Sequence, residues 1–385
     1  MNRSVRPRIF VSCGEPSGDL YAGALARALL TLDPSCEISG RGGPEFQRGG
    51  GRLLADYRGL AVTGFADIVS KVPALRAAKR RLVSAAQADR PHVLVVIDYF
   101  GFNVRLARDI KQLGVPVVYY VSPQIWAWRA GRMKAIRAIA DKVLVIFPFE
   151  EAIYRDAGVP VEFVGHPLID LVQTQVSRGA FLEPLGLNPS QPTVALLPGS
   201  RTSELRRILP TLMAAAGEIR RRVPAVQFVI ARAANLDDRL FEPAHRLHGV
   251  HIAEGKTDEV IASSDLVLTA SGTATVQTAL HDKPMVVVYR VSPLEYRVAR
   301  PFVRLDTFAM VNLIAGERIV PELIQDAFTA DALAAEAVSL LTDPQRVARI
   351  RQGLADVRRK LGEPGASRRA AEAVLTIAER ACESS

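Results

Sequence analysis

Short apolar runs alternate with longer segments of helical pattern in the first half of the chain. These runs are "RIFVS" (8–12), "HVLVVI" (92–97), "PVVYYVS" (116–122) and "DKVLVIF" (141–147). Continuous runs rich in Val and Ile are typical of strands that are buried on both faces, as in parallel sheets. Helical sequence such as 18–30 and 102–114 separates the runs, so the pattern predicts a doubly wound, parallel α/β domain.

The same alternation restarts after the Pro- and Gly-bearing segment 164–192. The second set of runs is "TVALL" (193–197), "VQFVIA" (226–231), "SDLVLTA" (264–270) and "KPMVVVYR" (283–290). A chain of 385 residues is longer than one core usually supports. We therefore expect two Rossmann-like domains, residues 1–170 and 171–365, that face each other across a cleft. A C-terminal helix within 366–385 is expected to return to the first domain.

Polar residues follow several of the predicted strands, where ligands of such sheets bind. Glu15, Asp98, Arg201 and Ser271 all lie at these positions. Asp98 ends "HVLVVID", and a carboxylate held there can take a proton from a hydroxyl nucleophile. A capping or loop-stabilising aspartate is the alternative interpretation.

The stretch "LLPGSRTSEL" (196–205) reads as strand, turn and helix. Gly199 permits a tight turn, Ser203 and Glu204 suit a helix start, and Arg201 can bind phosphate with two bonds. Free N–H groups and the helix dipole favour an anion there. The stretch is not a Walker A loop. A plain surface cation at Arg201 stays open as the alternative.

Two further glycine turns carry candidate ligand contacts. "TASGTATVQTAL" (269–280) places Ser271, Gly272, Thr273 and Thr275 at another helix start, which predicts a second phosphate-sized group of donors. An ordinary small-residue cap is the alternative. "SCGEPSGD" (12–19) offers Glu15 for a sugar hydroxyl, while its Ser17 and Asp19 are expected to cap the next helix. Neither turn has dinucleotide spacing, which disfavours a Rossmann dehydrogenase.

Composition narrows the class of partner. The chain is 49% hydrophobic and 23% charged with a net charge of +9, which is typical of a globular protein with an anionic partner. Nucleic acid is disfavoured because no zinc-finger spacing or RNA-binding aromatic signature is present. Three scattered cysteines fit a reducing cytosol, and neither a signal peptide nor a spanning helix is expected.

The segment "FADIVSKVPALRAAKRRL" (65–82) combines an apolar stripe with flanking cations. Ile68, Val69, Val72 and Leu75 recur at helical spacing among five Lys and Arg residues. This pattern suits an interfacial membrane helix, and equally a surface helix whose stripe packs on the core. Trp126 and Trp128 allow the same two interpretations, an acyl-binding surface or plain core.

Eight motifs, in order, resemble the lipid-A-disaccharide synthase family over roughly residues 8 to 330. They are "GEPSGDLYAGAL", "GFADIV", "YYVSPQIWAWRAGRMKAI", "FPFEEAIYRDAGVPVEFVGHPLID", "LLPGSRTSEL", "SGTAT", "PMVVVYRVSPLEY" and "PELIQ". The resemblance implies the GT-B glycosyltransferase fold and an inverting transfer. UDP-2,3-diacylglucosamine would donate to the 6-hydroxyl of 2,3-diacylglucosamine 1-phosphate, giving a β-1,6-linked disaccharide and UDP in lipid A biosynthesis.

The resemblance also assigns roles to residues of this chain. Asp98 would be the base, with Gly199, Ser200 and Arg201 at the diphosphate. The implied substrate contacts are Glu15, Ser17, Asn103, Gly199, Ser200, Arg201, Ser271, Gly272, Thr273, Ala274, Thr275, Gln277, Asn312 and Glu322. No metal and no cofactor are expected. Acylated substrates imply a cytoplasmic protein, peripheral on an anionic inner membrane, and a homodimer stays open.

Three positions depart from the family's usual pattern. "DYFGFN" keeps Asp98 and Asn103 but has Gly101 where a second carboxylate is common. Gln277 stands where Glu is usual, and Val311 precedes Asn312 where Pro is usual. The departures at Gly101 and Gln277 motivate a second hypothesis, a catalytically weak paralogue that binds UDP-sugar or acylated sugar phosphate at the membrane. A third is a GT-B enzyme that acts on another UDP-linked amino sugar.

Overall fold

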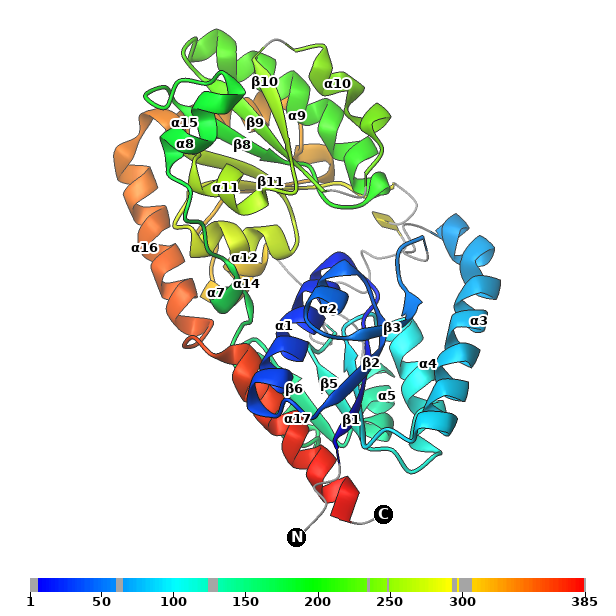
Figure 1. The fold of residues 1–385 in the computed structure, drawn as a ribbon. Helices are drawn as coiled ribbons and strands as arrows, with labels where there is room; N and C mark the ends of the chain where they lie inside the picture. Colours follow the sequence, from blue (N-terminus) through cyan, green and yellow to red (C-terminus); the bar gives the residue numbers. More distant parts are fainter. Residues whose placement is uncertain are drawn as a thin grey trace. The chain divides into compact units, whose positions relative to one another are not determined.

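A computed structural model gives the fold of the chain (Figure 1). It describes residues 6–59, 65–123, 131–233, 236–247, 249–292, 296–297 and 307–383, apart from the side chains of 65–70. The chain divides into two compact units, and each is described by itself. Unit 1 comprises Met1–Leu171 with Leu361–Ser385, and unit 2 comprises Val172–Lys360.

Unit 1 is built on a parallel sheet with the strand order β3-β2-β1-β4-β5-β6-β7. The strands are β1 (Arg8–Ser12), β2 (Glu37–Gly42), β3 (Arg52–Asp56), β4 (Val93–Ile97), β5 (Val117–Tyr120), β6 (Lys142–Val145) and β7 (Val161–Phe163). The helices are α1 (Pro16–Leu32), α2 (Pro44–Arg48), α3 (Phe65–Asp89), α4 (Phe100–Lys111), α5 (Gly131–Ile139), α6 (Pro148–Asp156), α7 (Leu168–Leu171) and α17 (Ala366–Glu383). Figure 1 shows α17 beside α1, with α3, α4 and α5 on the other face of the sheet.

Unit 2 repeats this architecture with the strand order β10-β9-β8-β11-β12-β13. Its strands are β8 (Thr193–Leu197), β9 (Gln227–Arg232), β10 (Val250–Glu254), β11 (Leu266–Ala270), β12 (Met285–Tyr289) and β13 (Glu322–Ile324). Its helices are α8 (Arg178–Leu182), α9 (Thr202–Arg222), α10 (Glu242–His245), α11 (Thr257–Ala262), α12 (Thr273–Leu280), α14 (Met310–Ala315), α15 (Ala330–Thr342) and α16 (Pro344–Lys360). All strand pairs of this sheet are parallel, as the alternation predicts.

The predicted strands form because their side chains are buried on both faces. Every residue of β4, β8 and β11 is buried, as a parallel sheet covered by helices on both sides requires. Cross-strand register places the carboxyl ends of β1 and β4 together, since Ser12 pairs with Val96. The loops that follow these two strands therefore meet at one edge of the unit 1 sheet.

The start of α1 differs from the prediction. The helix begins at Pro16 with Glu15 as its N-cap, because proline at the first position is preorganised for a helix. Ser17 thus lies inside the helix. The buried carboxylate of Asp19 accepts from the main-chain N–H groups of Gly43 (2.6 Å), Glu45 (3.0 Å) and Phe46 (3.1 Å), so it caps α2 and not α1.

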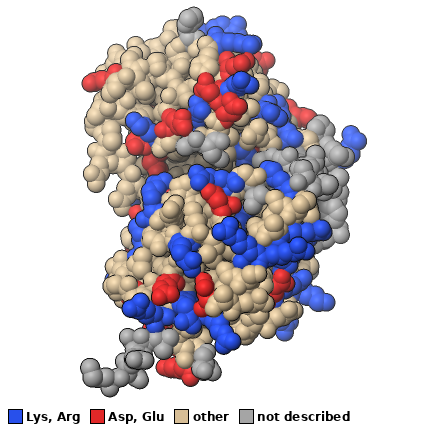
Figure 2. Space-filling view, turned by 45° about the vertical axis from the view of Figure 1, so that its right-hand side comes forward, with Lys and Arg blue, Asp and Glu red and all other residues tan. Residues whose placement is uncertain are grey.

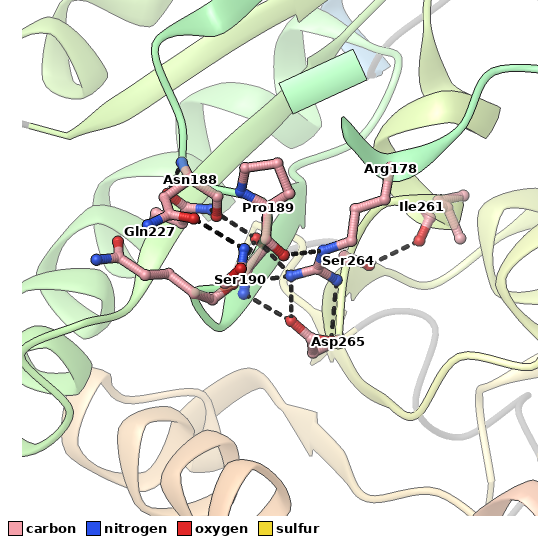
Figure 3. Close-up of polar contacts among 10 residues, drawn as sticks. Arg178, Asn188, Pro189, Ser190, Gln227, Ile261, Ser264 and Asp265 are labelled. Atoms are coloured by element: carbon pink, nitrogen blue, oxygen red, sulfur yellow. Dashed lines mark hydrogen bonds and ion pairs between the residues drawn. The ribbon is translucent and has the colours of Figure 1, made fainter. Parts of the chain in front are cut away.

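A polar cluster at the amino ends of β8 and β11 anchors the chain that leads into the unit 2 sheet (Figure 3). Arg178 pairs with Asp265 at 2.8 Å and donates to the main-chain oxygens of Pro189 (2.8 Å) and Gln191 (2.8 Å). Asp265 also accepts from the N–H of Thr193 at 2.8 Å. The cluster lies at the end of the sheet opposite to the strand ends that carry the candidate site, so its role is structural.

Candidate active site

Asp98 directly follows β4 in an unusual backbone conformation. Its φ is +45° and that of Tyr99 is +46°, so two consecutive residues with side chains occupy the left-handed region. This region is unfavourable for residues other than glycine, and such strain is retained where the surroundings fix it. The conformation turns the chain sharply between β4 and α4.

Asn103 fixes this turn from within. The side chain is fully buried, and its Nδ2 donates to the main-chain oxygens of Asp98 (2.8 Å) and Ile97 (3.1 Å). Its Oδ1 accepts from the hydroxyl of Ser12 at 2.8 Å. The sequence assigned Asn103 to substrate binding. In the structure these bonds hold the main chain at Asp98 in place, and a contact between Asn103 and substrate stays a prediction.

Two side chains that the sequence analysis did not single out surround Asp98. Tyr119 is fully buried and its hydroxyl donates to the main-chain oxygen of Asp98 at 2.9 Å; burial, and then the Asp98 charge, raise the pKa of this phenol. Arg132 of α5 is close enough for its pKa to be influenced by Asp98. Burial lowers the pKa of Arg132, while Tyr119 and Asp98 oppose this effect. Asp98 therefore has a cation and a neutral donor beside it.

The turn between β1 and α1 lies against the same residues. A side chain at Gly14 would collide with the ring of Tyr99, so glycine allows that ring to cover the turn. Glu15 is half-buried, and its charge is among the causes that raise the pKa of Tyr99, after burial. Ser17 is also half-buried, and no described residue accepts from or donates to its hydroxyl. Glu15 and Ser17 thus lie at the strand edge that carries Asp98.

In unit 2, the Gly-Ser-Arg turn already holds a negative charge from its own chain. Oε2 of Glu204 accepts from the N–H groups of Ser200 (3.2 Å) and Arg201 (3.4 Å), and its Oε1 pairs with Nη1 of Arg201 at 2.7 Å. The φ of Gly199 is +110°, which favours glycine. Glu204 is therefore the cap of α9. Ser203 was expected to share that role, but it lies within the helix.

The start of α12 lacks any such internal partner. Gly272 is the N-cap with a φ of +149°, and no side chain caps the helix. Within the described part of the chain, nothing accepts from the N–H groups of Gly272, Thr273 or Ala274. Gln277 lies one turn further along, half-buried, with no described partner for its amide. Unpaired N–H groups and the helix dipole favour an anion at this helix start.

Two hydroxyl groups at this turn are used internally. Thr275 is fully buried and its hydroxyl donates to the main-chain oxygen of Gly272 at 2.8 Å. Ser271 donates to the main-chain oxygen of Phe308 at 2.9 Å. The hydroxyl of Thr275 supports the turn, and its predicted contact with substrate stays a prediction.

Asn312 and Glu322 bond to the main chain near α14. Asn312 is buried, and its amide bonds Val320 O (3.0 Å), Glu322 Oε1 (2.7 Å) and the N–H groups of Ile319 (2.9 Å) and Val320 (3.0 Å). Glu322 accepts from the N–H groups of Phe308 (2.9 Å) and Ala309 (3.0 Å). Both were predicted substrate contacts. Their polar atoms fix the loop before α14, to which Ser271 is bonded, and their contacts with substrate stay predictions.

The remaining predictions concern metals and membranes. The described residues contain no group of three or more His, Cys, Asp or Glu side chains that could hold a metal ion. In the same residues, no helix has the length and apolar character needed to cross a bilayer. Leu75 packs against the unit 1 core and Val72 is half-buried. The side chains of Ile68 and Val69, and all of Trp126 and Trp128, lie outside the described residues.

Solved structures share this architecture over nearly the full chain. The UDP-GlcNAc 2-epimerase of Neisseria meningitidis bound to UDP-GlcNAc is similar with a TM-score of 0.65 and 12% identity, covering 96% of this chain and 99% of that one. The calicheamicin glycosyltransferase CalG4 is similar with a TM-score of 0.61 and 16% identity, covering 97% and 99%. These likenesses define the class: the two-domain α/β fold of GT-B glycosyltransferases and related epimerases, as the sequence predicts.

Sequence comparison then gives the family. The model of the lipid-A-disaccharide synthetase family matches residues 9–377. The lipid-A-disaccharide synthase of Geobacter sulfurreducens is 41% identical over 379 residues, covering 98% of this chain and 99% of that protein. That of Anaeromyxobacter sp. strain K is 43% identical over 375 residues, covering 96% and 97%. The chain belongs to the lipid-A-disaccharide synthetase family, which confirms the resemblance carried by its motifs.

Proposed function

We propose that this chain transfers the 2,3-diacylglucosaminyl group of UDP-2,3-diacylglucosamine to the 6-hydroxyl of 2,3-diacylglucosamine 1-phosphate. The products are the β-1,6-linked disaccharide 1-phosphate and UDP, an intermediate step of lipid A biosynthesis. Family membership supports the reaction. The observation that carries the mechanism is the fixed position of Asp98 at the end of β4. Asn103 and Tyr119 both donate to the main-chain oxygen of Asp98 and so position its carboxylate.

Asp98 is the proposed general base. Its carboxylate takes the proton of the 6-hydroxyl while that oxygen forms a bond to the anomeric carbon of the donor. The bond from this carbon to the diphosphate oxygen breaks, and UDP leaves with the electron pair. One displacement inverts the α-linked donor to a β-linked product. Arg132 supports this role because a neighbouring cation favours the ionised carboxylate that accepts the proton.

The start of α12 is the proposed site of the leaving diphosphate. The N–H groups of Gly272, Thr273 and Ala274 provide donors that are already aligned for the charge that develops on UDP. Arg201 adds a cation, provided that the phosphate competes with Glu204 for its guanidinium. Gln277 is proposed to contact the nucleoside. Glutamate is usual at this position, and the amide of glutamine keeps one acceptor oxygen and adds an NH₂ donor.

The weak-paralogue hypothesis rests on Gly101 and Gln277, and the surroundings of Gly101 favour an active enzyme. This residue is exposed near the start of α4, and a Cβ there would meet no atom within 4 Å. The departure therefore removes a surface side chain and leaves the contacts of Asp98 with Asn103 and Tyr119 in place.

We further propose that unit 1 contacts an anionic membrane through the face formed by α3, α4 and α5. Figure 2 shows Lys and Arg side chains gathered on unit 1. The exposed cations of these helices are Arg76, Arg80, Arg81, Arg105, Arg108, Lys134 and Arg137. The two acidic residues described on them, Asp89 and Asp109, are ion-paired with Arg52 and Lys79. A net cationic surface suits anionic headgroups, which surround both acylated substrates.

The membrane proposal is tested by co-sedimentation with phosphatidylglycerol and phosphatidylcholine vesicles. We expect binding to the anionic vesicles alone. The double variant Arg105→Glu, Arg137→Glu should weaken this binding, whereas Arg246→Glu, an exposed residue of unit 2, should not. Equal binding of both variants would exclude the α3–α5 face as the contact.

The proposed reaction is tested by incubating wild-type protein with both acylated substrates in detergent, with and without EDTA. Formation of disaccharide 1-phosphate and UDP in equal amounts is the expected result. Folded protein that binds UDP but forms no disaccharide would support the binding paralogue. Inhibition by a different soluble UDP-amino sugar, which then serves as the better donor, would support the third hypothesis.

A further inference from the structure

A buried cation in unit 1 lacks partners for most of its donors. Arg41 of β2 has no exposed surface, and its Nη1 donates to the main-chain oxygen of Cys13 at 3.0 Å. Its Nε and Nη2 are buried and have no hydrogen-bond partner among the described residues. A buried guanidinium with unpaired donors is costly, so its retention requires an explanation.

Neighbouring carboxylates do not satisfy these donors. Asp56 influences Arg41 electrostatically, but its Oδ1 accepts from the main-chain N–H of Arg58 at 2.8 Å and its Oδ2 accepts from Nη2 of Arg58 at 2.6 Å. The carboxylate of Asp19 accepts from three N–H groups at the start of α2. Among the described residues, the other close neighbours of the guanidinium are aromatic: the ring centroids of Tyr99 and Phe102 lie 5.0 and 4.5 Å from its Cζ. Burial lowers the pKa of Arg41, and the polar side chain of Tyr99 opposes this effect.

Arg41 lies beside the residues proposed for catalysis. Cys13, to which it donates, is two residues before Glu15, and Tyr99, which packs on it, is the residue after Asp98. The start of α1 follows the same turn, and no side chain caps this helix. Phe102 is buried, whereas Tyr99 is half-buried. Of the two rings that pack on Arg41, that of Tyr99 is therefore the one that is partly exposed to solvent.

We propose that Arg41 binds the phosphate of the acceptor through Nε and Nη2 after the ring of Tyr99 moves aside. This inference rests on the proposed function and assigns a phosphate monoester to unit 1. Nε and Nη2 form the planar pair of donors that binds two phosphate oxygens at once. The phosphate on C1 and the hydroxymethyl group that carries the 6-hydroxyl are separate substituents on the two carbons that flank the ring oxygen. Anchoring the phosphate at Arg41 therefore leaves the 6-hydroxyl for Asp98 and orients it for attack.

The test measures the affinity of detergent-solubilised protein for 2,3-diacylglucosamine 1-phosphate and for the same lipid without phosphate. Wild type should prefer the phosphorylated lipid about 10-fold or more, as expected for charge-assisted bonds. Arg41→Met should lose this preference. Arg58→Met, a matched control on an exposed arginine of the same region, should keep it. Arg41→Lys, which keeps the charge but not the paired donors, should retain only part of it.

Three outcomes would overturn the inference. One is the absence of any preference in wild type, and another is a preference that Arg41→Met or Arg41→Lys retains in full while circular dichroism shows a folded protein. Titrations with UDP and with phosphatidylglycerol vesicles identify the source of the phosphate. The third outcome is that the Arg41 variants lose affinity for only one of these two probes. Loss of UDP binding alone would assign Arg41 to the donor, and loss of vesicle binding alone would assign it to a lipid headgroup. Should Arg41→Met fail to fold, Arg41→Lys decides alone.

Failure of the proposed function is distinguishable from failure of this inference. The binding titrations do not require transfer. Wild type that binds the phosphorylated lipid through Arg41 but forms no disaccharide would retain the subsite and contradict the reaction. Wild type that forms disaccharide equally well from both acceptors would retain the reaction and contradict the subsite.

Discussion

Nη1 of Arg201 lies 2.7 Å from Oε1 of Glu204, so the cation that the sequence assigns to the donor phosphate holds a carboxylate three residues further along the chain. The other oxygen of this carboxylate accepts from two N–H groups of the same turn. A phosphate that binds here must replace Glu204 or share these donors with it. Glu204 therefore weakens the attraction of this turn for UDP.

Replacing Glu204 with Gln should strengthen UDP binding. The substitution removes a negative charge from the turn, and the 40% exposure of the Arg201 side chain limits the gain to about two- to five-fold in affinity. Isothermal titration with UDP measures it. Glu218→Gln, which removes the charge of an ion pair further along α9, is the matched control and should leave the affinity unchanged. Weaker binding by a folded Glu204→Gln protein would show that this carboxylate positions Arg201 for the phosphate.

Replacing Gly199 with Ala should destabilise the same turn. Its φ of +110° is unfavourable for alanine, and the new Cβ would lie 2.8 Å from the Cβ of Glu204. We expect a loss of about 1–3 kcal/mol in the free energy of unfolding, measured by urea denaturation. Gly217→Ala, inside α9 with no atom within 4 Å of the new Cβ, should gain about 0.5–1 kcal/mol. Equal effects of the two changes would contradict the strained turn.

Replacing Asn103 with Ala should reduce transfer through Asp98 as well as stability. The change leaves the buried Ser12 hydroxyl and the main-chain oxygen of Asp98 without this partner, at about 1–3 kcal/mol in the free energy of unfolding. The value of kcat should fall more than KM changes, because the base loses its position. Asn188→Ala, which removes the hydrogen bond between its side chain and the N–H of Ser190 in unit 2, should lower stability with kcat retained. A loss of stability with unchanged kcat in Asn103→Ala would assign Asn103 to the fold alone.

His166 should make the protein less stable as pH falls. Burial lowers the pKa of this imidazole to about 3, against about 6.5 in the unfolded chain. Below pH 6.5 the unfolded chain therefore binds a proton that the folded chain does not, and stability decreases until both forms are protonated near pH 3. At pH 5 the expected loss is about 2 kcal/mol.

Urea denaturation at pH 7 and pH 5 checks this effect. The decrease between the two values should be smaller in His166→Gln than in wild type. His245→Gln, a change at an exposed histidine of α10, should retain the wild-type decrease. An identical pH dependence in His166→Gln and wild type would contradict the assignment to His166.

The sequence predicted the strands that have apolar runs and missed those that do not. β2 has the sequence "EISGRG", yet it is buried from its second residue onward. Glycine explains this, because a side chain at Gly40 would collide with the main chain of Val11. Burial by close backbone approach leaves no apolar pattern to read. The short edge strand β7 was also missed. It carries a charged residue at its centre, so it has no continuous apolar run.

The sequence predicted where the turns of the candidate site lie better than it predicted what each of their residues does. Strand ends identified the turns that contain Asp98, Arg201 and Gly272. Sequence alone does not show which polar residues there bond to the main chain, so it did not predict the internal bonds of the buried Asn103 and Asn312. Arg41 was missed because its significance depends on contacts with Cys13 and Tyr99, residues far away in the sequence.

The most direct test of the account compares kcat for disaccharide formation between wild type and Asp98→Asn, with Asp109→Asn as a control on α4. Asparagine keeps the shape of the side chain but cannot accept the proton, and we predict a loss of about 10²–10⁴-fold, as expected for a general base. Affinity for UDP should be unchanged, and Asp109→Asn should retain wild-type kcat. Transfer by a folded Asp98→Asn protein at the wild-type rate would contradict the assignment of Asp98 as the base.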